Sequence, residues 1–255
     1  MVRPKKHLGQ HFLTDPNIAR KTVESLRFPM ENLLEIGPGK GILTALIMAK
    51  DVKDFRVVEI DSESAEYLRL TYPGLQQNII EDDFLSLDLS LLFQHRFSVI
   101  GNFPYNISSQ ILFKILEHKN QVDEVVGMFQ KEVAERIASA PGNKKYGILS
   151  VLIQAFFDIE YLFTVNEGVF FPPPKVKSAV IRLRRNSTMQ LTCDERMFFE
   201  LVKTAFNQRR KVLKNALSRY AFKSDSKLDI LLRRRAEELD VQDFELLTSL
   251  VVQKS

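Results

Sequence analysis

Residues 33–43 read Leu-Leu-Glu-Ile-Gly-Pro-Gly-Lys-Gly-Ile-Leu, and this stretch decides how the first half of the chain folds. An apolar run ends in an acid, glycines follow at every second position, and a helical pattern of apolar residues then begins. This order predicts a buried strand, a tight turn and the start of a helix. Because glycine has no Cβ, the turn can pass close to a bound ligand.

A second apolar run, residues 55–60, carries Glu59 near its end, about twenty residues after the glycines. A carboxylate at the tip of the neighbouring strand can accept hydrogen bonds from both hydroxyls of a ribose. The first half therefore predicts an open α/β sheet that binds an adenosine-containing cofactor. The glycine pattern is E-x-G-x-G-x-G, whereas nicotinamide cofactors favour G-x-G-x-x-G. It is the usual form in S-adenosylmethionine (SAM) methyltransferases, so SAM is favoured over NAD.

Two further predicted strand ends carry residues suited to an adenine base. Glu81-Asp82-Asp83-Phe84 follows a strand expected at 78–80, where an acid can accept from the exocyclic amine and a ring can cover the base. The alternative there is a capping acid beside a core phenylalanine. Residues 101–108 read Gly-Asn-Phe-Pro-Tyr-Asn-Ile-Ser and follow a strand expected at 97–100. This is the most specific stretch of the sequence.

Pro104 biases Phe103 toward an extended backbone, so the Phe103 carbonyl can point into the cleft beside the Asn102 side chain. Tyr105 adds a flat ring. Two acceptors and a stacking ring suit a nucleobase with an exocyclic amine, and the alternative is a turn with buried aromatic residues.

Residues 169–176 read Val-Phe-Phe-Pro-Pro-Pro-Lys-Val. Three consecutive prolines exclude a helix and favour a stiff extended segment. Such a segment would hold Phe170 or Phe171 as a second wall for a base. The alternative is a hydrophobic plug under a loop.

The sequence changes character after Arg184, and we expect a first domain over residues 1–185 and a helical domain over 186–255. Asp194 is placed to cap a long amphipathic helix that reaches Leu213. On it, Lys203, Arg210 and Lys214 are spaced to share one face, for which a solvated surface is the alternative.

Further helices are expected over about 227–231, 234–239 and 241–253. The 255 residues are 45% hydrophobic, enough for a sizeable core, and a net charge of +4 permits a nucleic-acid partner. One cysteine, Cys193, excludes an internal disulfide and a cysteine-based metal site. We expect a soluble, cytoplasmic protein, because no apolar run is long enough to span a bilayer.

Seven motifs occur in order along nearly the whole chain, at residues 9–13, 35–41, 58–61, 102–108, 129–136, 172–176 and 206–211. Together they resemble the small-subunit rRNA adenine N6,N6-dimethyltransferases, the KsgA family. The resemblance implies a Rossmann-like SAM-dependent methyltransferase domain followed by a small all-α C-terminal domain. It also implies a metal-free monomer that dimethylates two adjacent adenosines, in the hairpin near the 3′ end of small-subunit rRNA, within a pre-assembled small ribosomal subunit.

Carried over position by position, the resemblance implies that His11 and Leu13 close over SAM, with His11 standing where the family often has Asn. Gly37 and Gly39 would lie along the cofactor, and Glu59 would hold its ribose. Asp83 would read its adenine, although Asp82 precedes it as a second acid. The register of the following apolar residues favours Asp83.

Asn102 would border both the methionyl end of SAM and the target amine. Its side-chain oxygen and the Phe103 carbonyl would accept the two N6 hydrogens, while Tyr105 and Phe170 would grip the unstacked base. The segment that would contact rRNA contains four basic residues: Arg209, Arg210, Lys211 and Lys214.

Two other functions stay open at this point. The nearest enzyme is the large-subunit rRNA adenine methyltransferase class that confers macrolide resistance; the triple proline and the Asn-Gln-Arg-Arg-Lys segment favour the small-subunit family. A different class is a binding role in rRNA assembly, in which methylation is secondary. An intact Asn102-Phe103-Pro104-Tyr105 favours retained chemistry.

Overall fold

The structure is a computed structural model that describes residues 2–27 and 29–252. The chain packs as two compact units. The first holds the residues up to Ala134 together with Ile159–Arg185, and the second holds Glu135–Asp158 together with the residues from Asn186 onward.

The division differs from the single boundary expected near residue 185, because residues 135–158 join the C-terminal helices. Helix α6 (Ile148–Gln154) packs against α7 (Glu195–Asn207) and α10 (Val241–Ser249). The buried ring of Tyr146 lies with its centroid 6.1 Å from that of Phe206. The apolar stretch before β7 therefore completes the core of the helical unit.

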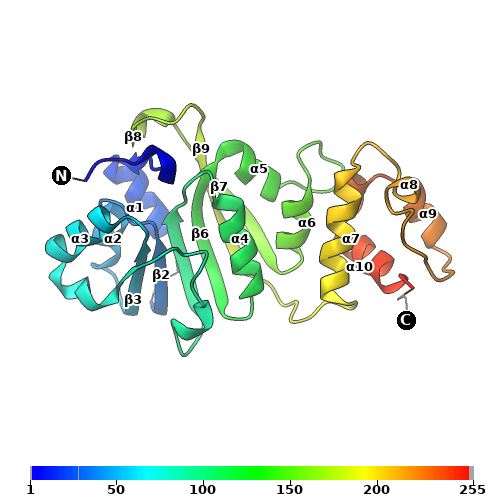
Figure 1. Ribbon diagram of the computed structural model, residues 1–255, viewed down its shortest axis with the longest axis horizontal. Coiled ribbons are helices and arrows are strands. Elements are labelled where there is room, and N and C mark those ends of the chain that lie inside the picture. Colours follow the sequence, from blue (N-terminus) through cyan, green and yellow to red (C-terminus); the bar gives the residue numbers. More distant parts are fainter. Residues whose placement is uncertain (1, 28, 253–255) are drawn as a thin grey trace. The chain divides into compact units, whose positions relative to one another are not determined.

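A seven-stranded sheet forms the centre of the first unit (Figure 1), in the order β4-β3-β2-β5-β6-β9-β7. Its strands are β2 (Met30–Ile36), β3 (Val52–Glu59), β4 (Ile79–Glu81), β5 (Phe97–Asn102), β6 (Val122–Gln130), β7 (Phe157–Val165) and β9 (Ser178–Arg185). The strands β2 to β6 run parallel, and β9 runs antiparallel to β6. The chain leaves β2 for β3 on one side and later returns to β5 on the other, so a topological switch point lies between β2 and β5.

Helices connect most of the parallel strands, whereas only a 3-10 turn, Leu89–Leu91, lies between β4 and β5. The helices are α1 (Pro16–Glu24), α2 (Ile42–Ile47), α3 (Ser62–Thr71), α4 (Ser108–Glu117) and α5 (Lys131–Ile137). Asp15 caps α1, accepting from the backbone N–H groups of Asn17 and Ile18. Asp61 caps α3 and accepts from the backbone N–H group of Glu63. The predicted α/β architecture is confirmed.

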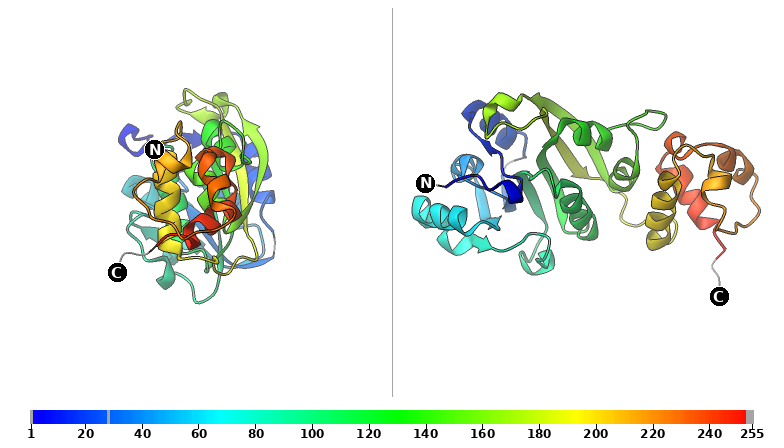
Figure 2. Two further views of the ribbon diagram at one scale, coloured as in Figure 1. Left: turned by 90° about the vertical axis from the view of Figure 1, so that its right-hand side faces the viewer. Right: turned by 45° about the horizontal axis from the view of Figure 1, so that its top comes forward.

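A short strand near the N-terminus joins this unit from outside the main sheet. Strand β1 (Phe12–Leu13) pairs antiparallel with β8 (Phe170–Phe171), just before the three prolines. The right view of Figure 2 shows the blue N-terminal segment next to the yellow-green segment around residue 170. Segments almost 160 residues apart in the chain therefore lie side by side.

The second unit is helical, and its remaining helices are α8 (Leu213–Ala216) and α9 (Leu228–Arg233). Asp194 caps α7, as predicted, with Oδ1 2.7 Å from Met197 N. The expected extension of this helix to Leu213 is wrong, because α7 ends at Asn207 and a turn follows. Arg210 and Lys214 therefore do not share a helix face with Lys203.

Helix α10 ends at Ser249, and the expected helix end at Gln253 lies outside the described residues. A 3-10 turn, Ala236–Glu238, stands where a helix was expected over 234–239. In the described parts of the chain, no helix is both long and apolar enough to cross a bilayer.

Candidate cofactor and nucleobase pocket

A pocket opens at the carboxyl ends of β2, β3, β4 and β5, where the switch point of the sheet lies. It encloses about 900 Å³ of empty space, including the open solvent at its mouth. Its walls are the glycine loop after β2, the acids that end β3 and follow β4, the loop 102–107 and the N-terminal residues 8–12. Residues distant in sequence meet here because parallel strands end at one edge.

The glycine loop leaves room for an elongated ligand. Gly37 and Gly39 line the pocket with φ angles of 65° and 56°, in the left-handed region. A Cβ on Gly39 would lie 2.8 Å from the Phe12 ring, so the loop and Phe12 touch only because no side chain is present. A Cβ on Gly37 would meet only Pro104, at 4.0 Å, so Gly37 faces open space.

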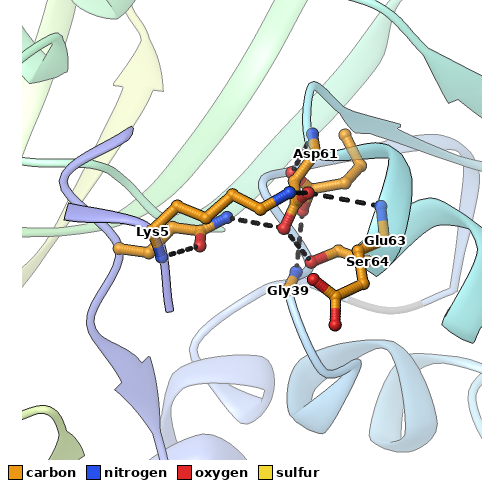
Figure 3. A network of polar contacts seen from close by, with 7 residues as sticks. Lys5, Gly39, Asp61, Glu63 and Ser64 are labelled. Carbon is orange, nitrogen blue, oxygen red and sulfur yellow. Dashed lines mark hydrogen bonds and ion pairs between the residues drawn. The ribbon is translucent and has the colours of Figure 1, made fainter. Parts of the chain in front are cut away.

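Glu59 is held rigidly at the end of β3. Its side chain is buried, with Oε2 3.0 Å from Gly39 N and Oε1 3.0 Å from Asp61 N (Figure 3). Burial raises the pKa of this carboxyl, while the N–H groups of Asp61 and Gly39 act in the opposite direction. A carboxylate has more lone pairs than these two bonds use, so the site fits the ribose of an adenosine cofactor.

Both acids after β4 line the pocket, together with the buried Phe84. Asp82 is exposed, and its Oδ1 lies 2.7 Å from Asp83 N. Asp83 is half-buried, and its Oδ1 lies 2.9 Å from Leu85 N. The greater enclosure of Asp83 favours it over Asp82 for an adenine, and Phe84 supplies the neighbouring ring.

Asn102 at the end of β5 has a defined side-chain orientation. Its Nδ2 donates to the backbone oxygen of His11 at 2.8 Å. Because a carbonyl oxygen can only accept, this contact places the amide nitrogen on the side of His11 and leaves the amide oxygen on the other side. An amide held in this way is a preorganised hydrogen-bond acceptor.

The ring of Phe103 lies under the loop in a slot made by two glycines. Gly101 and Gly127 are paired across β5 and β6. A Cβ on Gly101 would lie 2.6 Å from a ring atom of Phe103, and a Cβ on Gly127 would lie 2.5 Å from another. Phe103 is buried and belongs to the pocket lining, and the expected direction of its carbonyl stays a prediction.

Tyr105 is held by two contacts. Its hydroxyl lies 2.6 Å from Ser178 Oγ, and its ring stacks on that of His11 with centroids 5.4 Å apart. Burial raises the pKa of Tyr105, so the phenol stays neutral near pH 7. His11 Nδ1 in turn donates to the Pro172 carbonyl at 2.7 Å.

A cover segment, residues 5–14, crosses the pocket and is fastened to the start of α3 (Figure 3). Lys5 Nζ forms an ion pair with Asp61 Oδ1, and Gln10 Nε2 lies 3.4 Å from Asp61 Oδ2. Gln10 Oε1 also accepts from Lys5 N at 2.8 Å. Lys5 lowers the pKa of the Asp61 carboxyl against the opposing effect of burial.

Two predicted site residues lie elsewhere. Leu13 and Phe170 are opposite one another in the β1–β8 pair and are 5% and 4% exposed, inside the hydrophobic core. Leu13 reaches only a small neighbouring cavity that it shares with Gly37 and Asn102. The expectation that Phe170 forms a wall of the base site is not supported, because its ring points into the core while Phe171 is exposed.

The four basic residues of the predicted rRNA segment differ from one another. Arg210, Lys211 and Lys214 are exposed. Arg209 instead holds the second unit together, because its guanidinium pairs with Glu237 and donates to the Lys144 carbonyl. An isolated bridge between Val212 and Arg235 brings a further exposed arginine beside this segment.

Sequence reasoning missed several pocket residues. Ile60, 49% exposed, and Gln10 both line the pocket. Ile60 could have been predicted, because it is an apolar residue directly after Glu59 at a strand end. The contact of Ser178 with Tyr105 could not, because only the fold brings these two residues together. Among the residues that the structure describes, no group of His, Cys, Asp and Glu side chains is arranged to hold a metal ion.

Comparison with known proteins identifies relatives across the full length. The family model for ribosomal RNA adenine dimethylase matches residues 1–253. The chain is 53% identical to the ribosomal RNA small subunit methyltransferase A of Cytophaga hutchinsonii, over 98% of both proteins. It is 54% identical to the Bacteroides fragilis protein of the same name, over 99% of this chain and 94% of that protein.

Two solved structures share the fold over nearly the whole chain. A dimethyladenosine transferase from Plasmodium falciparum superposes with a TM-score of 0.76 at 25% identity, over 94% of this chain and 99% of that one. The 23S rRNA methyltransferase ErmE superposes with a TM-score of 0.71 at 25% sequence identity, over 93% of this chain and 99% of that chain. The fold alone does not separate these two classes, whereas sequence identity favours the small-subunit relatives.

Proposed function

The chain belongs to the ribosomal RNA adenine dimethylase family, and from this premise we propose that it dimethylates N6 of adenosines in small-subunit rRNA with SAM as the methyl donor. The proposed targets are two adjacent adenosines of the hairpin near the 3′ end, modified during assembly of the subunit. The pocket supports the proposal because it combines a place for SAM with acceptors for an amine.

The observation that carries the proposal is the orientation of Asn102. Its nitrogen is engaged by the His11 carbonyl at 2.8 Å, so its oxygen is the end available to a ligand. The backbone of Phe103 follows directly and lines the same pocket. Two neighbouring acceptors match the two hydrogens of an adenine amine.

The residues at the strand ends fit SAM. Gly37, Gly39, Glu59 and Asp83 all line the pocket. The glycine loop would lie along the cofactor, Glu59 would accept from its ribose, and Asp83 would accept from its adenine amine. SAM, when bound, supplies a methyl group to a nucleophile that approaches in line with its carbon–sulfur bond. The cover segment would then shield the cofactor from solvent.

The chemical problem is the weak nucleophilicity of N6, whose lone pair is delocalised into the adenine ring. Acceptance of both hydrogens by Asn102 and Phe103 pulls the nitrogen toward tetrahedral geometry and exposes the lone pair. Catalysis then depends on positioning and preorganised acceptors rather than on a strong base. Each transfer leaves S-adenosylhomocysteine and releases one N6 proton to water. After the first transfer a single hydrogen remains, so one acceptor suffices and the pocket must admit a methyl group.

A base in a helix cannot reach this pocket, so the target leaves its stack and packs on Tyr105. The partner is the small ribosomal subunit, contacted in part through Arg210, Lys211 and Lys214, whose positive charges suit phosphates. We expect a monomer that acts in the cytoplasm.

The test is methyl transfer to small subunits from cells that lack the protein, followed by mass mapping of their rRNA. We expect two dimethylated adenosines in the 3′-terminal hairpin and none in large-subunit rRNA. Methylation confined to large-subunit rRNA would contradict the proposal in favour of the macrolide-resistance class. Full rescue of a deletion strain by the Asn102→Ala variant would instead favour a binding role.

A further inference from the structure

Phe171 is a large aromatic side chain left exposed beside the pocket. It is 57% exposed, whereas Phe170 is 4% exposed. In the β1–β8 pair, Phe171 lies opposite Phe12 and Phe170 lies opposite Leu13. Directly opposed residues of an antiparallel pair project to the same face. Phe171 therefore shares its face with Phe12, which lines the pocket, while Phe170 shares the core face of Leu13.

The backbone around Phe171 is tethered on both sides. The Val169 carbonyl accepts from Thr14 N at 2.8 Å and from Thr14 Oγ1 at 2.9 Å. The Pro172 carbonyl accepts from His11 Nδ1 at 2.7 Å. Pro172 and the two prolines after it restrict the chain further. An exposed aromatic ring is thus presented from a fixed position.

That position is next to the proposed base site. The His11 ring that bonds to Pro172 stacks on Tyr105, with the ring planes 28° apart. Phe171 is therefore one residue away from the contact that covers Tyr105. Phe171 is not among the residues that line the pocket, so its ring can contact a part of the RNA at the pocket mouth rather than the target base inside.

A flipped nucleotide leaves its neighbour with one face unstacked. Exposed aromatic side chains bind such faces in single-stranded RNA, and a protein that supplies one recovers part of the missing stacking energy. We propose that Phe171 stacks on the base of the nucleotide adjacent to the target and so positions the RNA backbone at the pocket mouth. This inference rests on the proposed function and adds a residue that holds substrate outside the catalytic pocket.

The first experiment measures methyl-transfer kinetics on under-methylated small subunits for Phe171→Ala and Phe171→Tyr. The control is Val176→Ala, which shortens another exposed apolar side chain of the same segment, 47% exposed. We expect Phe171→Ala to raise KM by about tenfold or more, as removal of one base stack predicts, with SAM affinity unchanged. The tyrosine variant and the control should stay near the parent. A parental KM for Phe171→Ala would overturn the inference.

The second experiment locates the contact. Small subunits are reconstituted with synthetic 3′ rRNA segments that carry an abasic site on one side of the target or the other. If the abasic site removes the base that Phe171 contacts, the parent enzyme should methylate this substrate as poorly as Phe171→Ala methylates the intact one. The variant acting on the abasic substrate should then be little worse than either change alone. Impairments that multiply at both positions would overturn the inference. If the parent enzyme methylates neither adenosine of the intact substrate, the proposed function itself is overturned. This outcome differs from the failure of the Phe171 inference.

Discussion

At the residue scale, single side chains in the pocket each hold two parts of the molecule. Asn102 offers an acceptor to the ligand while its nitrogen anchors the cover segment through the His11 carbonyl. Glu59 offers lone pairs to a ribose while it ties together Gly39 and Asp61. Removing such a residue therefore alters ligand contacts and the backbone around them together.

Asn102→Ala should slow methyl transfer by about a hundredfold or more, because one preorganised acceptor for N6 is removed. Asn102→Asp should be impaired too, since its carboxylate places an acceptor against the His11 carbonyl, where the parent has a donor. Single-turnover transfer with saturating SAM tests both variants. Parental rates for the alanine variant would show that Asn102 is not the amine acceptor.

Glu35, at the start of the glycine loop, gives a pH-dependent prediction. Its side chain is buried and accepts from Thr44 Oγ1 at 2.7 Å, and burial raises its pKa from 4.5 to about 8. Between these values, the unfolded chain loses this proton while the folded chain keeps it. Glu35 therefore destabilises the fold progressively as the pH rises from 4.5 toward 8, by at most about 1.4 kcal/mol per pH unit.

Replacement by Glu35→Gln removes this titration. In urea denaturation without SAM, the stability of the variant relative to the parent should increase from pH 5 to pH 8. Glu63→Gln, at an exposed position, serves as the control. A difference between Glu35→Gln and parent that does not change with pH would contradict the prediction.

At the scale of elements, the cover segment depends on three other parts of the first unit. Lys5 pairs with Asp61 at the start of α3, and His11 bonds to Asn102 at the end of β5 and to Pro172 after β8. Its residues 8–12 form one wall of the pocket. These contacts hold in place the segment that forms this wall of the proposed SAM site.

Lys5→Met should increase the rate of SAM dissociation by about twofold to fivefold, because the lysine side chain of this ion pair is 35% exposed and such a pair contributes modestly. The effect should diminish at high salt, where the parent pair is screened. Displacement kinetics with labelled SAM measure the rate. Lys6→Met, at an exposed neighbouring position, is the matched control. Equal dissociation rates for the two variants would show that the Lys5 contact does not retain the cofactor.

At the scale of the whole molecule, cofactor chemistry and the basic segment belong to different units. Every residue that lines the pocket lies in the first unit, whereas Arg210, Lys211 and Lys214 lie in the second. Binding of SAM and binding of the small subunit should therefore be separable by mutation. Arg209 is excluded from this set because it is paired with Glu237.

Reversing Arg210, Lys211 and Lys214 to Glu should weaken binding to small subunits. It should also reduce the salt dependence of binding by about one unit of slope for each phosphate that the protein no longer neutralises. SAM affinity should stay at the parental value. Binding titrations over a range of salt concentrations, with calorimetry for SAM, measure both quantities.

The matched control reverses Arg196, Lys223 and Lys227, which are exposed residues of the same unit, and changes the net charge by the same amount. An identical weakening of binding in the control would indicate a general effect of charge. An unaltered salt slope in the first variant would identify its three residues as an ordinary solvated surface.

Much of the first unit follows from the sequence by itself. The glycines after an apolar run require a strand, a turn and a helix, and the acids and Asn102 stand at predicted strand ends. Parallel strands bring such ends to one edge, so Gly37, Glu59, Asp83 and Asn102 meet in one pocket. These inferences depend on local backbone preferences and on residue periodicity, which a sequence displays directly.

Other features were decided only by the tertiary structure. The pairing register of β1 with β8 directs Phe170 into the core and leaves Phe171 exposed, and a shift by one residue would exchange them. Arg209 is distinguished from Arg210 by Glu237, which lies 28 residues further along the chain. The segment 135–158 joins the helical unit because its apolar side chains find partners on α7 and α10. Each of these outcomes depends on contacts between distant segments, whose partners no local pattern specifies.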